Sequence, residues 1–236
     1  GTTDLDVHVR FPTLEDLPKE QVEIDVKGTL NDVVMPGLVE GLDLTGGPYD
    51  LKVEDDQYTV KGSGMLAGRN ITLEWQQYFE SAGKPWSGRA IAELGADKAL
   101  REHFGVNLDD YISGTLPVKI DYKMRLKGRQ DTIGIEADLT PVLLTFKPLE
   151  FSKAAKDPAR GSAQVILDDD RLVEVNSLTL EGDDLLLQNG RFIFGQVKGA
   201  RDVVRAQIDR LRMNENDFAL EFEQEKKGLL KMSLNG

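Results

Sequence analysis

The sequence predicts a mainly β protein, an antiparallel meander with one short helix. Residues 116–126 are apolar at every even position, which gives an extended strand one apolar face and one charged face. Similar short segments recur along the whole chain, separated by Gly, Asp and Asn. No alternation of strands with helices is visible, so a parallel sheet is not expected.

In the first part of the chain, alternation with a period of two predicts a series of strands. Pro12 ends the first strand, and the acidic turn Glu54-Asp55-Asp56 closes a hairpin between the third and the fourth. Residues 29–40 read as irregular, with a turn at Pro36-Gly37. The strands are expected at 5–9, 22–26, 49–53, 58–60 and 71–75.

The single helix is expected in the middle of the chain. Asp97 can cap its N-terminus, Leu100 and Phe104 give it an apolar side, and Gly105 can end it. It lies in the stretch 76–112, where the period-two pattern is lost. We interpret this stretch as a helical connector, the one weak subdivision of a single β module spanning residues 1–236.

Strands resume after the helix and continue to the end of the chain. A polar stretch at 152–160, with Pro158, reads as a loop, and Asp168-Asp169-Asp170 reads as an acidic hairpin turn. The chain ends in strand-like sequence, which we interpret as the open edge of a fragment cut from a longer β protein. The strands are expected at 116–126, 133–139, 143–146, 163–167, 172–175, 178–180, 185–187, 192–194, 204–208, 218–222 and 230–234.

Composition excludes several classes of function. The net charge of −12 opposes non-specific binding to nucleic acid or to an anionic membrane surface. The chain has no cysteine, which excludes disulfides and thiolate catalysis.

No catalytic or cofactor motif is visible, so we expect neither an enzyme nor a cofactor. The only histidines, His8 and His103, are far apart in the sequence, and there is no nucleophile elbow or zinc-binding helix. The glycines of the stretch 62–68 precede strand-like sequence rather than a helix, so a bulge or turn explains them better than a phosphate loop. The acidic clusters lack the spaced ligands of a calcium loop and read as solvated turns.

Two architectures can use one apolar face repeated over many strands. A sandwich or closed barrel buries the faces against each other, as in a structural envelope module without a ligand. An open, curved sheet instead leaves its apolar face available to apolar ligands, and large exposed apolar patches are rare without a function.

The amino-acid sequence of several segments resembles the AsmA-like family of bacterial envelope proteins, which includes the TamB and YhdP types. The resemblance covers most of the chain and is plainest over residues 108–195; the region before Tyr49 matches less well, and the usual N-terminal membrane anchor is missing. Its motifs are loose strand and turn signatures. They are the block 108–114 followed by Leu116-Pro117-Val118, then 135–140, Phe151-Ser152-Lys153 with Gly161, 178–183 and Asn216-Asp217.

The resemblance implies an antiparallel meander curled into an open, repeating β-groove whose apolar face lines a channel for phospholipid. It also implies a periplasmic location as part of an inner-membrane-anchored protein that moves phospholipid towards the outer membrane; the identity of an outer-membrane protein partner is unknown. No catalytic residue and no cofactor come with it. The expected lipid-facing residues are the apolar ones of the best alternating strands: Leu116, Val118, Ile120, Tyr122, Met124, Leu126, Ile133, Ile135, Ile71, Leu73 and Trp75.

Such a surface makes physical sense for lipid. Each acyl CH₂ group exposed to water costs roughly 0.8 kcal/mol, so a wall of apolar side chains makes acyl-chain transfer nearly neutral in free energy. The competing interpretation is that the same residues pack against a covering helix or second sheet. The helix near Asp97 is then a connector packed on the sheet rather than a lid.

Overall fold

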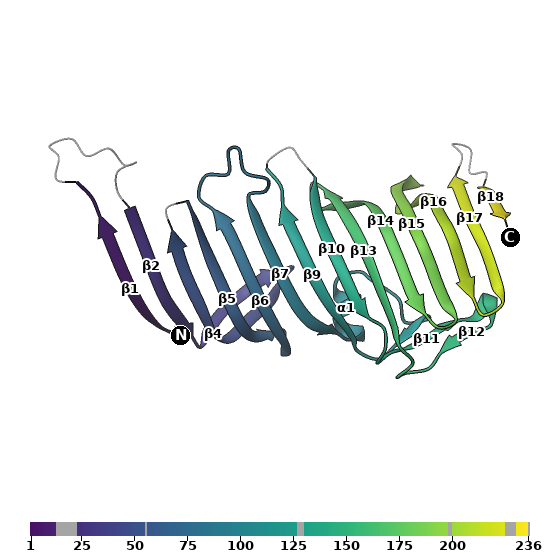
Figure 1. Ribbon diagram of the computed structural model, residues 1–236, viewed down its shortest axis with the longest axis horizontal. Helices are drawn as coiled ribbons and strands as arrows, with labels where there is room; N and C mark the ends of the chain where they lie inside the picture. The colour runs from purple at the N-terminus through teal and green to yellow at the C-terminus, as the bar shows by residue number, and fades with distance from the viewer. Residues whose placement is uncertain (13–22, 55, 127–129, 198–199, 225–229, 236) are drawn as a thin grey trace. The chain divides into compact units, whose positions relative to one another are not determined.

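The protein is mainly β, with 73% of its residues in strands, as the sequence predicts. The computed structural model describes residues 1–12, 23–54, 56–126, 130–197, 200–224 and 230–235 (Figure 1). Fifteen strands form one antiparallel sheet that is not closed, consistent with an open groove, and three short strands form a second sheet. The hydrogen-bonded order of the large sheet is β1-β2-β4-β5-β6-β7-β9-β10-β13-β14-β15-β16-β17-β18, with β3 paired to β4.

The contacts within the chain divide it into two compact units. The first unit comprises residues 1–94 and 121–128, and the second comprises 95–120 and 129–236. The strands of the first unit are β1 (Thr2–Arg10), β2 (Glu23–Asn31), β3 (Val33–Val39), β4 (Leu42–Glu54), β5 (Gln57–Leu66), β6 (Arg69–Tyr78) and most of β7 (Gly88–Ala96).

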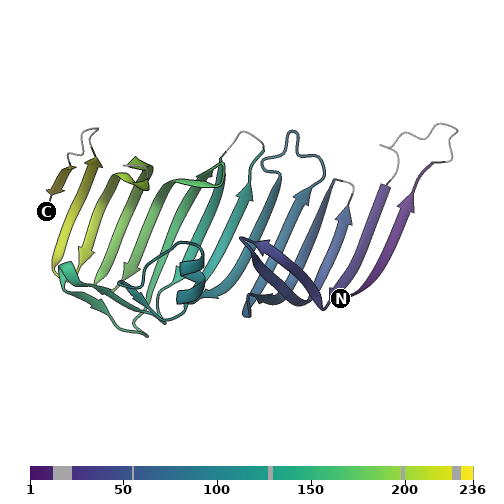
Figure 2. The ribbon, with the colours of Figure 1, turned by 180° about the vertical axis from the view of Figure 1, so that it is seen from behind.

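The first unit has its own small core under the hairpin formed by β3 and the start of β4. Figure 2 shows this hairpin lying across one end of the other strands of the unit. Tyr49 is the most buried residue of this core, at 1% exposure, and its ring crosses the glycines of β5. A Cβ atom at Gly62 or Gly64 would overlap Tyr49, so these two glycines make room for the ring. The buried members of the core are Leu44, Tyr49, Leu66 and Ile71.

Two stretches of the first unit differ from the sequence prediction. Residues 29–40 are not irregular, because β2 runs on to Asn31 and β3 follows; the register shift of β3 against β4 and the positive φ of Gly37 hide its alternation. The stretch 76–112 also contains β7, whose small residues obscure the pattern. As predicted, the glycines at 62–68 include a turn residue: Gly68, with a φ of 77°, lies in the turn between β5 and β6, and the bulge of this region lies on the neighbouring β4, between Gly46 and Tyr49. Val22 and Asp55 of the expected strand and turn lie outside the described residues.

In the second unit, one end of the large sheet is covered by the helix and the three-stranded sheet (Figure 2). The helix α1 (Lys98–His103) is capped by Asp97, whose Oδ1 accepts from the Leu100 N–H at 2.9 Å, as predicted. The remaining elements are β8 (Ile112–Ser113), β9 (Leu116–Met124, shared with the first unit), β10 (Asp131–Asp138), β11 (Leu143–Phe146), a 3₁₀ turn η2 (Lys147–Leu149), β12 (Phe151–Lys153), β13 (Ala159–Asp168), β14 (Arg171–Gly182), β15 (Leu185–Val197), β16 (Ala200–Met213), β17 (Asn216–Gln224) and β18 (Leu230–Asn235).

A buried arginine stabilises the cover of the second unit, by which we mean helix α1 and the three-stranded sheet of β8, β11 and β12. Arg101 is 5% exposed, and its Nη1 donates to the carbonyls of Ala96 at 2.8 Å and Gly114 at 3.0 Å. Its Nη2 donates to Asp109 at 3.2 Å. These bonds tie the helix to the chain on either side of it. The larger core beneath consists of Leu116, Leu139, Val142, Leu144, Phe151, Ala159, Leu185, Leu187, Ile208, Leu211 and Met213.

The polar stretch 152–160 is shorter as a loop than predicted. β12 extends to Lys153 and β13 begins at Ala159, so only the residues between them form a turn. The Lys153 Nζ is buried and donates to the carbonyls of Ala154 at 2.7 Å and Asp157 at 2.9 Å, which satisfies the turn from within. Because lysine normally lies in solvent, the sequence predicts a solvated loop here, although the Lys153 side chain is buried.

Candidate functional site

The apolar face of the first unit continues well beyond its covered core. Residues directly opposite in neighbouring strands share a face, and the register places Val7, Val26, Val53 and Tyr58 in one row across four strands. With strands about 4.8 Å apart, this row is about 14 Å long. We call the apolar residues of this region the first open strip: Leu5, Val7, Val9, Ile24, Val26, Leu51, Val53, Tyr58 and Trp75.

Burial falls along β6 with distance from the covering hairpin. On β6, Ile71 is 6% exposed, Leu73 packs against the core, and Trp75 is only half-buried although all three share one face. At the β1 side of the strip the apolar side chains are open to solvent, with Val7 at 55% and Leu5 at 48% exposure. No described element covers these residues.

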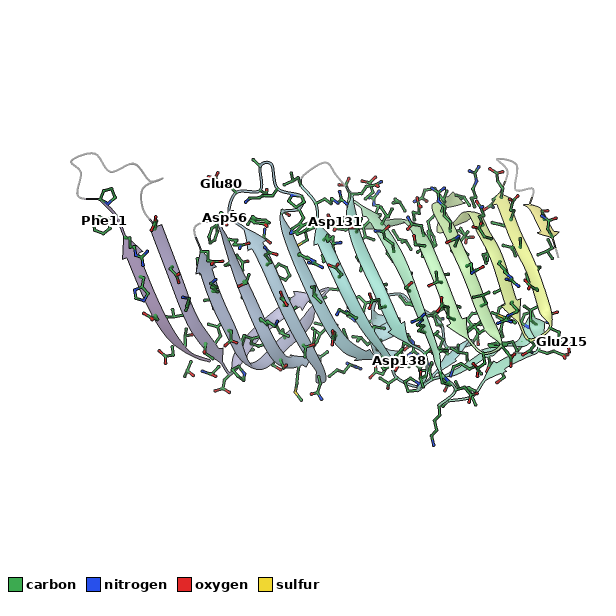
Figure 3. The ribbon with its side chains drawn as sticks, viewed as in Figure 1. Phe11, Asp56, Glu80, Asp131, Asp138 and Glu215 are labelled. Atoms are coloured by element: carbon green, nitrogen blue, oxygen red, sulfur yellow. The ribbon has the colours of Figure 1, made fainter. Side chains whose placement is uncertain are left out.

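The second unit shows the same gradient. On β10, Leu139 just past the strand end is 3% exposed, Ala137 packs against the core, and Ile135 and Ile133 are half-buried and lie outside it. Figure 3 shows Asp138 at the covered end of β10 and Asp131 at the opposite end. The register sets Ile133, Val165 and Val175 side by side. The second open strip comprises Ile120, Ile133, Ile135, Val165, Leu167 and Val175.

The opposite face of the sheet is polar and carries cross-strand ion pairs. Lys61–Glu74 in the first unit and Arg160–Glu181 in the second are each directly opposite in register and joined by an ion pair, at 3.3 and 2.5 Å. Such exposed pairs add little stability, but they show which face is turned to water. The open strips therefore lie on the face that has no such pairs among the residues described.

The predicted charged face of β9 follows this pattern. Arg89 donates to both oxygens of Asp121, at 2.7 and 2.9 Å, and these hydrogen bonds lower the pKa of the Asp121 carboxyl. Lys119 and Arg125 are exposed, while Asp121 and Lys123 are half-buried and pair at 3.4 Å. The odd-numbered residues of this strand thus form a polar outer wall.

The end of the first open strip farthest from the hairpin is rimmed by aromatic and charged side chains. Phe11 and Phe79 are 60% and 56% exposed. The Lys84 Nζ lies 2.5 Å from the Asp56 carboxylate and 4.7 Å from the Tyr78 ring centroid. Figure 3 shows Phe11, Asp56 and Glu80 at this same end of the strands. A rim of this kind suits a ligand that is apolar along its length and polar at one end.

The predicted lipid-facing residues divide into two groups by their contact with the cores. Leu116 and Ile71 are buried in the two cores, and the half-buried Val118 and Leu73 pack against them. The other seven are also half-buried but lie outside both cores, and Met124 lies beside Gly88 on the apolar face. The first unit holds Ile71, Leu73, Trp75, Tyr122, Met124 and Leu126, and the second holds Leu116, Val118, Ile120, Ile133 and Ile135.

Sequence reasoning missed the exposed apolar residues of the first open strip that lie on β1 and β2. Leu5, Val7, Val9 and Ile24 have the same alternation as β9, and exposure between 44% and 55%. Their period-two pattern was the available signal, but alternation does not distinguish a covered strand from an uncovered one.

The described residues hold no set of acidic, histidine or cysteine side chains that could bind a metal ion. The acidic turns at 168–170 and 183–184 are solvent-exposed, and Asp169 and Asp170 adopt positive φ values of 48° and 57°, a turn conformation that Asp tolerates. A depression on the polar face of β1, β2 and β4 mixes Asp4, Asp6 and Asp50 with Lys27 and Lys52, so the lysines offset two of its three negative charges.

None of the helices described has the length and apolar character needed to cross a membrane. No family model, no curated protein and no solved structure matches this chain. The open strips are therefore the feature on which a functional conclusion must stand.

Proposed function

We propose that this chain binds phospholipid acyl chains along its open strips and has no enzymatic function or cofactor. The observation that carries the proposal is apolar surface beyond the two cores: Leu5 and Val7 are 48% and 55% exposed, and Trp75 and Ile133 are only half-buried on the same faces as the buried Ile71 and Leu139. Contiguous uncovered apolar surface is uncommon in soluble proteins unless it binds something.

The chemistry of the strips favours acyl chains over a compact ligand. The side chains are aliphatic and aromatic, and their register forms rows across several strands rather than an enclosed pocket. Each CH₂ group moved from water onto such a surface gains roughly 0.8 kcal/mol, with no requirement for a specific polar contact. The aromatic and charged rim near Phe79 and Lys84 can stay with the hydrated head group.

We further propose that the chain is a periplasmic segment of an AsmA-like protein that forms a bridge for lipid between the bacterial inner and outer membranes. The support for the family, the location and the inner-membrane anchor is the sequence resemblance over residues 108–195. A structural module without a ligand is the alternative, and it leaves the uncovered strips without a purpose.

Lipid carried through a detergent-free purification tests the proposal. Native mass spectrometry should find bound phospholipid on the wild-type chain, because the strips offer it an apolar surface. Val53→Asp and Ile135→Asp should each reduce the bound fraction several-fold. The matched controls are Thr59→Asp and Gln164→Asp, which place the same charge on the polar face of a neighbouring strand.

Two outcomes would count against lipid binding. One is wild-type protein that remains free of lipid after incubation with phospholipid vesicles. The other is an equal loss of lipid in the Asp variants of both faces, which would mean that general destabilisation and not the apolar strip governs the result.

A further inference from the structure

The turn between β4 and β5 and the loop between β6 and β7 meet at the rim of the first open strip. The Phe79 N–H donates to the carbonyl of Asp56 at 2.9 Å, and the Lys84 Nζ donates to the Asp56 carboxylate at 2.5 Å. The Lys84 N–H also donates to the carbonyl of Ser81 at 3.1 Å, which closes a turn within the loop. Two segments that are distant in the sequence are thus joined at this rim.

The Lys84 ammonium is bound by two groups of different chemistry. The Asp56 carboxylate accepts one of its N–H groups, and the Tyr78 ring centroid lies 4.7 Å from the Nζ. The hydrogen bond to Asp56 raises the pKa of Lys84, so the amine is charged at neutral pH. A carboxylate and an aromatic ring together recognise a primary ammonium, since one accepts its N–H groups and the other attracts its charge.

This ammonium site lies on the lip between the two faces of the sheet. Tyr78 shares the polar face of β6 with Gln76, whose Nε2 donates to its hydroxyl at 3.3 Å. The next residue, Phe79, has its ring centroid 5.9 Å from that of Tyr58, which belongs to the first open strip. A molecule whose apolar part lies on the strip can therefore reach the ammonium site with its polar end at the lip.

The charges at the rim favour a zwitterionic head group. Among the residues described there, Asp56 and Glu80 carry negative charges and Lys84 carries a positive one (Figure 3). A phosphoethanolamine head group has a primary ammonium two carbons away from its phosphate. This ammonium can replace that of Lys84 on Asp56, and the Lys84 Nζ, on a flexible stem with 34% of the side chain exposed, can then pair with the phosphate.

The exchange turns one ion pair into two, because the head group is inserted between Asp56 and Lys84. A phosphoglycerol head group has no ammonium, so its phosphate would take Lys84 away from Asp56 and leave that carboxylate without a cation. A quaternary ammonium, as in phosphocholine, can contact the Tyr78 ring but offers no N–H to the carboxylate.

We propose that Asp56, Tyr78 and Lys84 form a head-group subsite for phospholipids that carry a primary ammonium, of the phosphatidylethanolamine type. Lys84 fills the ammonium position in the free protein and pairs with the phosphate when lipid is bound. This inference rests on the proposed function, because acyl chains on the first open strip bring the head group to the rim.

Competition between head groups tests the subsite. The chain is incubated with vesicles that contain equal amounts of phosphatidylethanolamine, phosphatidylglycerol and phosphatidylcholine with identical acyl chains, and mass spectrometry measures the composition of the bound lipid. Ile135→Asp in every chain reduces the contribution of the second open strip. Phosphatidylethanolamine should be enriched about two- to fivefold over each of the others, the range for one exposed ion pair.

Two substitutions separate recognition of the ammonium from simple loss of the ion pair. Asp56→Asn removes the carboxylate, so the enrichment should disappear. Lys84→Gln frees the carboxylate and the ring and weakens phosphate binding for all three lipids alike, so the enrichment should persist or rise. The matched control is Lys61→Gln, which breaks the exposed pair with Glu74 on the polar face of the same unit and should leave the enrichment unchanged.

The amount of bound lipid and its composition answer different questions. A chain that binds no lipid of any kind overturns the proposed function and the subsite with it. Lipid bound in the proportions of the vesicle, or an enrichment lost equally in Asp56→Asn and Lys84→Gln, overturns the subsite and leaves the proposed function standing. Equal enrichment of phosphatidylcholine and phosphatidylethanolamine also overturns it, because the ring alone would then select the head group.

Discussion

Replacing Arg101 with methionine should destabilise the second unit by about 3 kcal/mol. Methionine keeps much of the apolar stem, but it removes the guanidinium that donates to Ala96 and Gly114 and to Asp109. The carbonyls of Ala96 and Gly114 then lose their charged hydrogen-bond donor. Because Arg101 is only 5% exposed, they lose it inside the protein and not at its surface. The cover over the larger core is thus expected to loosen first.

The magnitude follows from the bonds lost. Hydrogen bonds to a charged group contribute about 1.5–3 kcal/mol each, so the two bonds to the carbonyls of Ala96 and Gly114 together account for about 3 kcal/mol at the lower figure. Removing one partner of a buried ion pair costs about 3–5 kcal/mol. The lower end applies here, because Asp109 keeps a second partner: the Lys98 Nζ lies 2.6 Å from its Oδ2.

Urea denaturation followed by circular dichroism measures this loss, with Lys98→Met as the matched control. Lys98 contacts the same carboxylate, but its side chain is 65% exposed, so its removal should cost no more than about 1 kcal/mol. Hydrogen exchange should show residues 98–114 losing protection in the Arg101 variant. If the two variants unfold at the same urea concentration, the buried arginine does not hold the cover and the reasoning is wrong.

Three further changes test other parts of the fold. Gly64→Ala should lower stability by about 1–3 kcal/mol, since its Cβ would overlap the Tyr49 Oη; thermal unfolding measures the loss. Tyr49→Phe should raise the melting temperature, because the Oη is buried without a hydrogen-bond partner and removing it saves about 1 kcal/mol of desolvation. The pKa of Asp121 is lowered by the hydrogen bonds from Arg89, so its contribution is present at neutral pH and is lost as the pH falls below about 4. Asp121→Asn should flatten that acid loss in urea titrations, whereas Asp168→Asn, in an exposed turn, should not.

Much of the strand framework could be predicted from the sequence. The alternation of apolar and polar residues alone predicts the hairpin of β4 and β5 and the long strand β9. A strand with one buried face has apolar residues at every second position, and this pattern is visible in the sequence. The helix could be located as well, since Asp97 and Gly105 supply its start and stop signals. Where a bulge, a proline or small residues interrupt the alternation, as in β3 and β7, the strands were missed.

The extent of the cover could not be predicted, because it is a tertiary property. Ile71 and Trp75 share a strand and a face, yet one is buried and the other is not. The difference comes from the hairpin of β3 and β4, which is formed by residues 33–46. Arg101 was missed for a related reason: a charged residue in a short amphipathic helix is normally solvated, and only its carbonyl partners show that it is structural.

Site-specific photocross-linking to phospholipid tests the central claim most directly. A benzophenone side chain is introduced at Ile135, on the second open strip, or at the adjacent Glu136, which is exposed on the opposite face. After incubation with phospholipid vesicles and irradiation, we expect lipid adducts at position 135 and none above background at position 136. Equal labelling at both positions, or none at either, would contradict the claim that the uncovered apolar strip binds lipid.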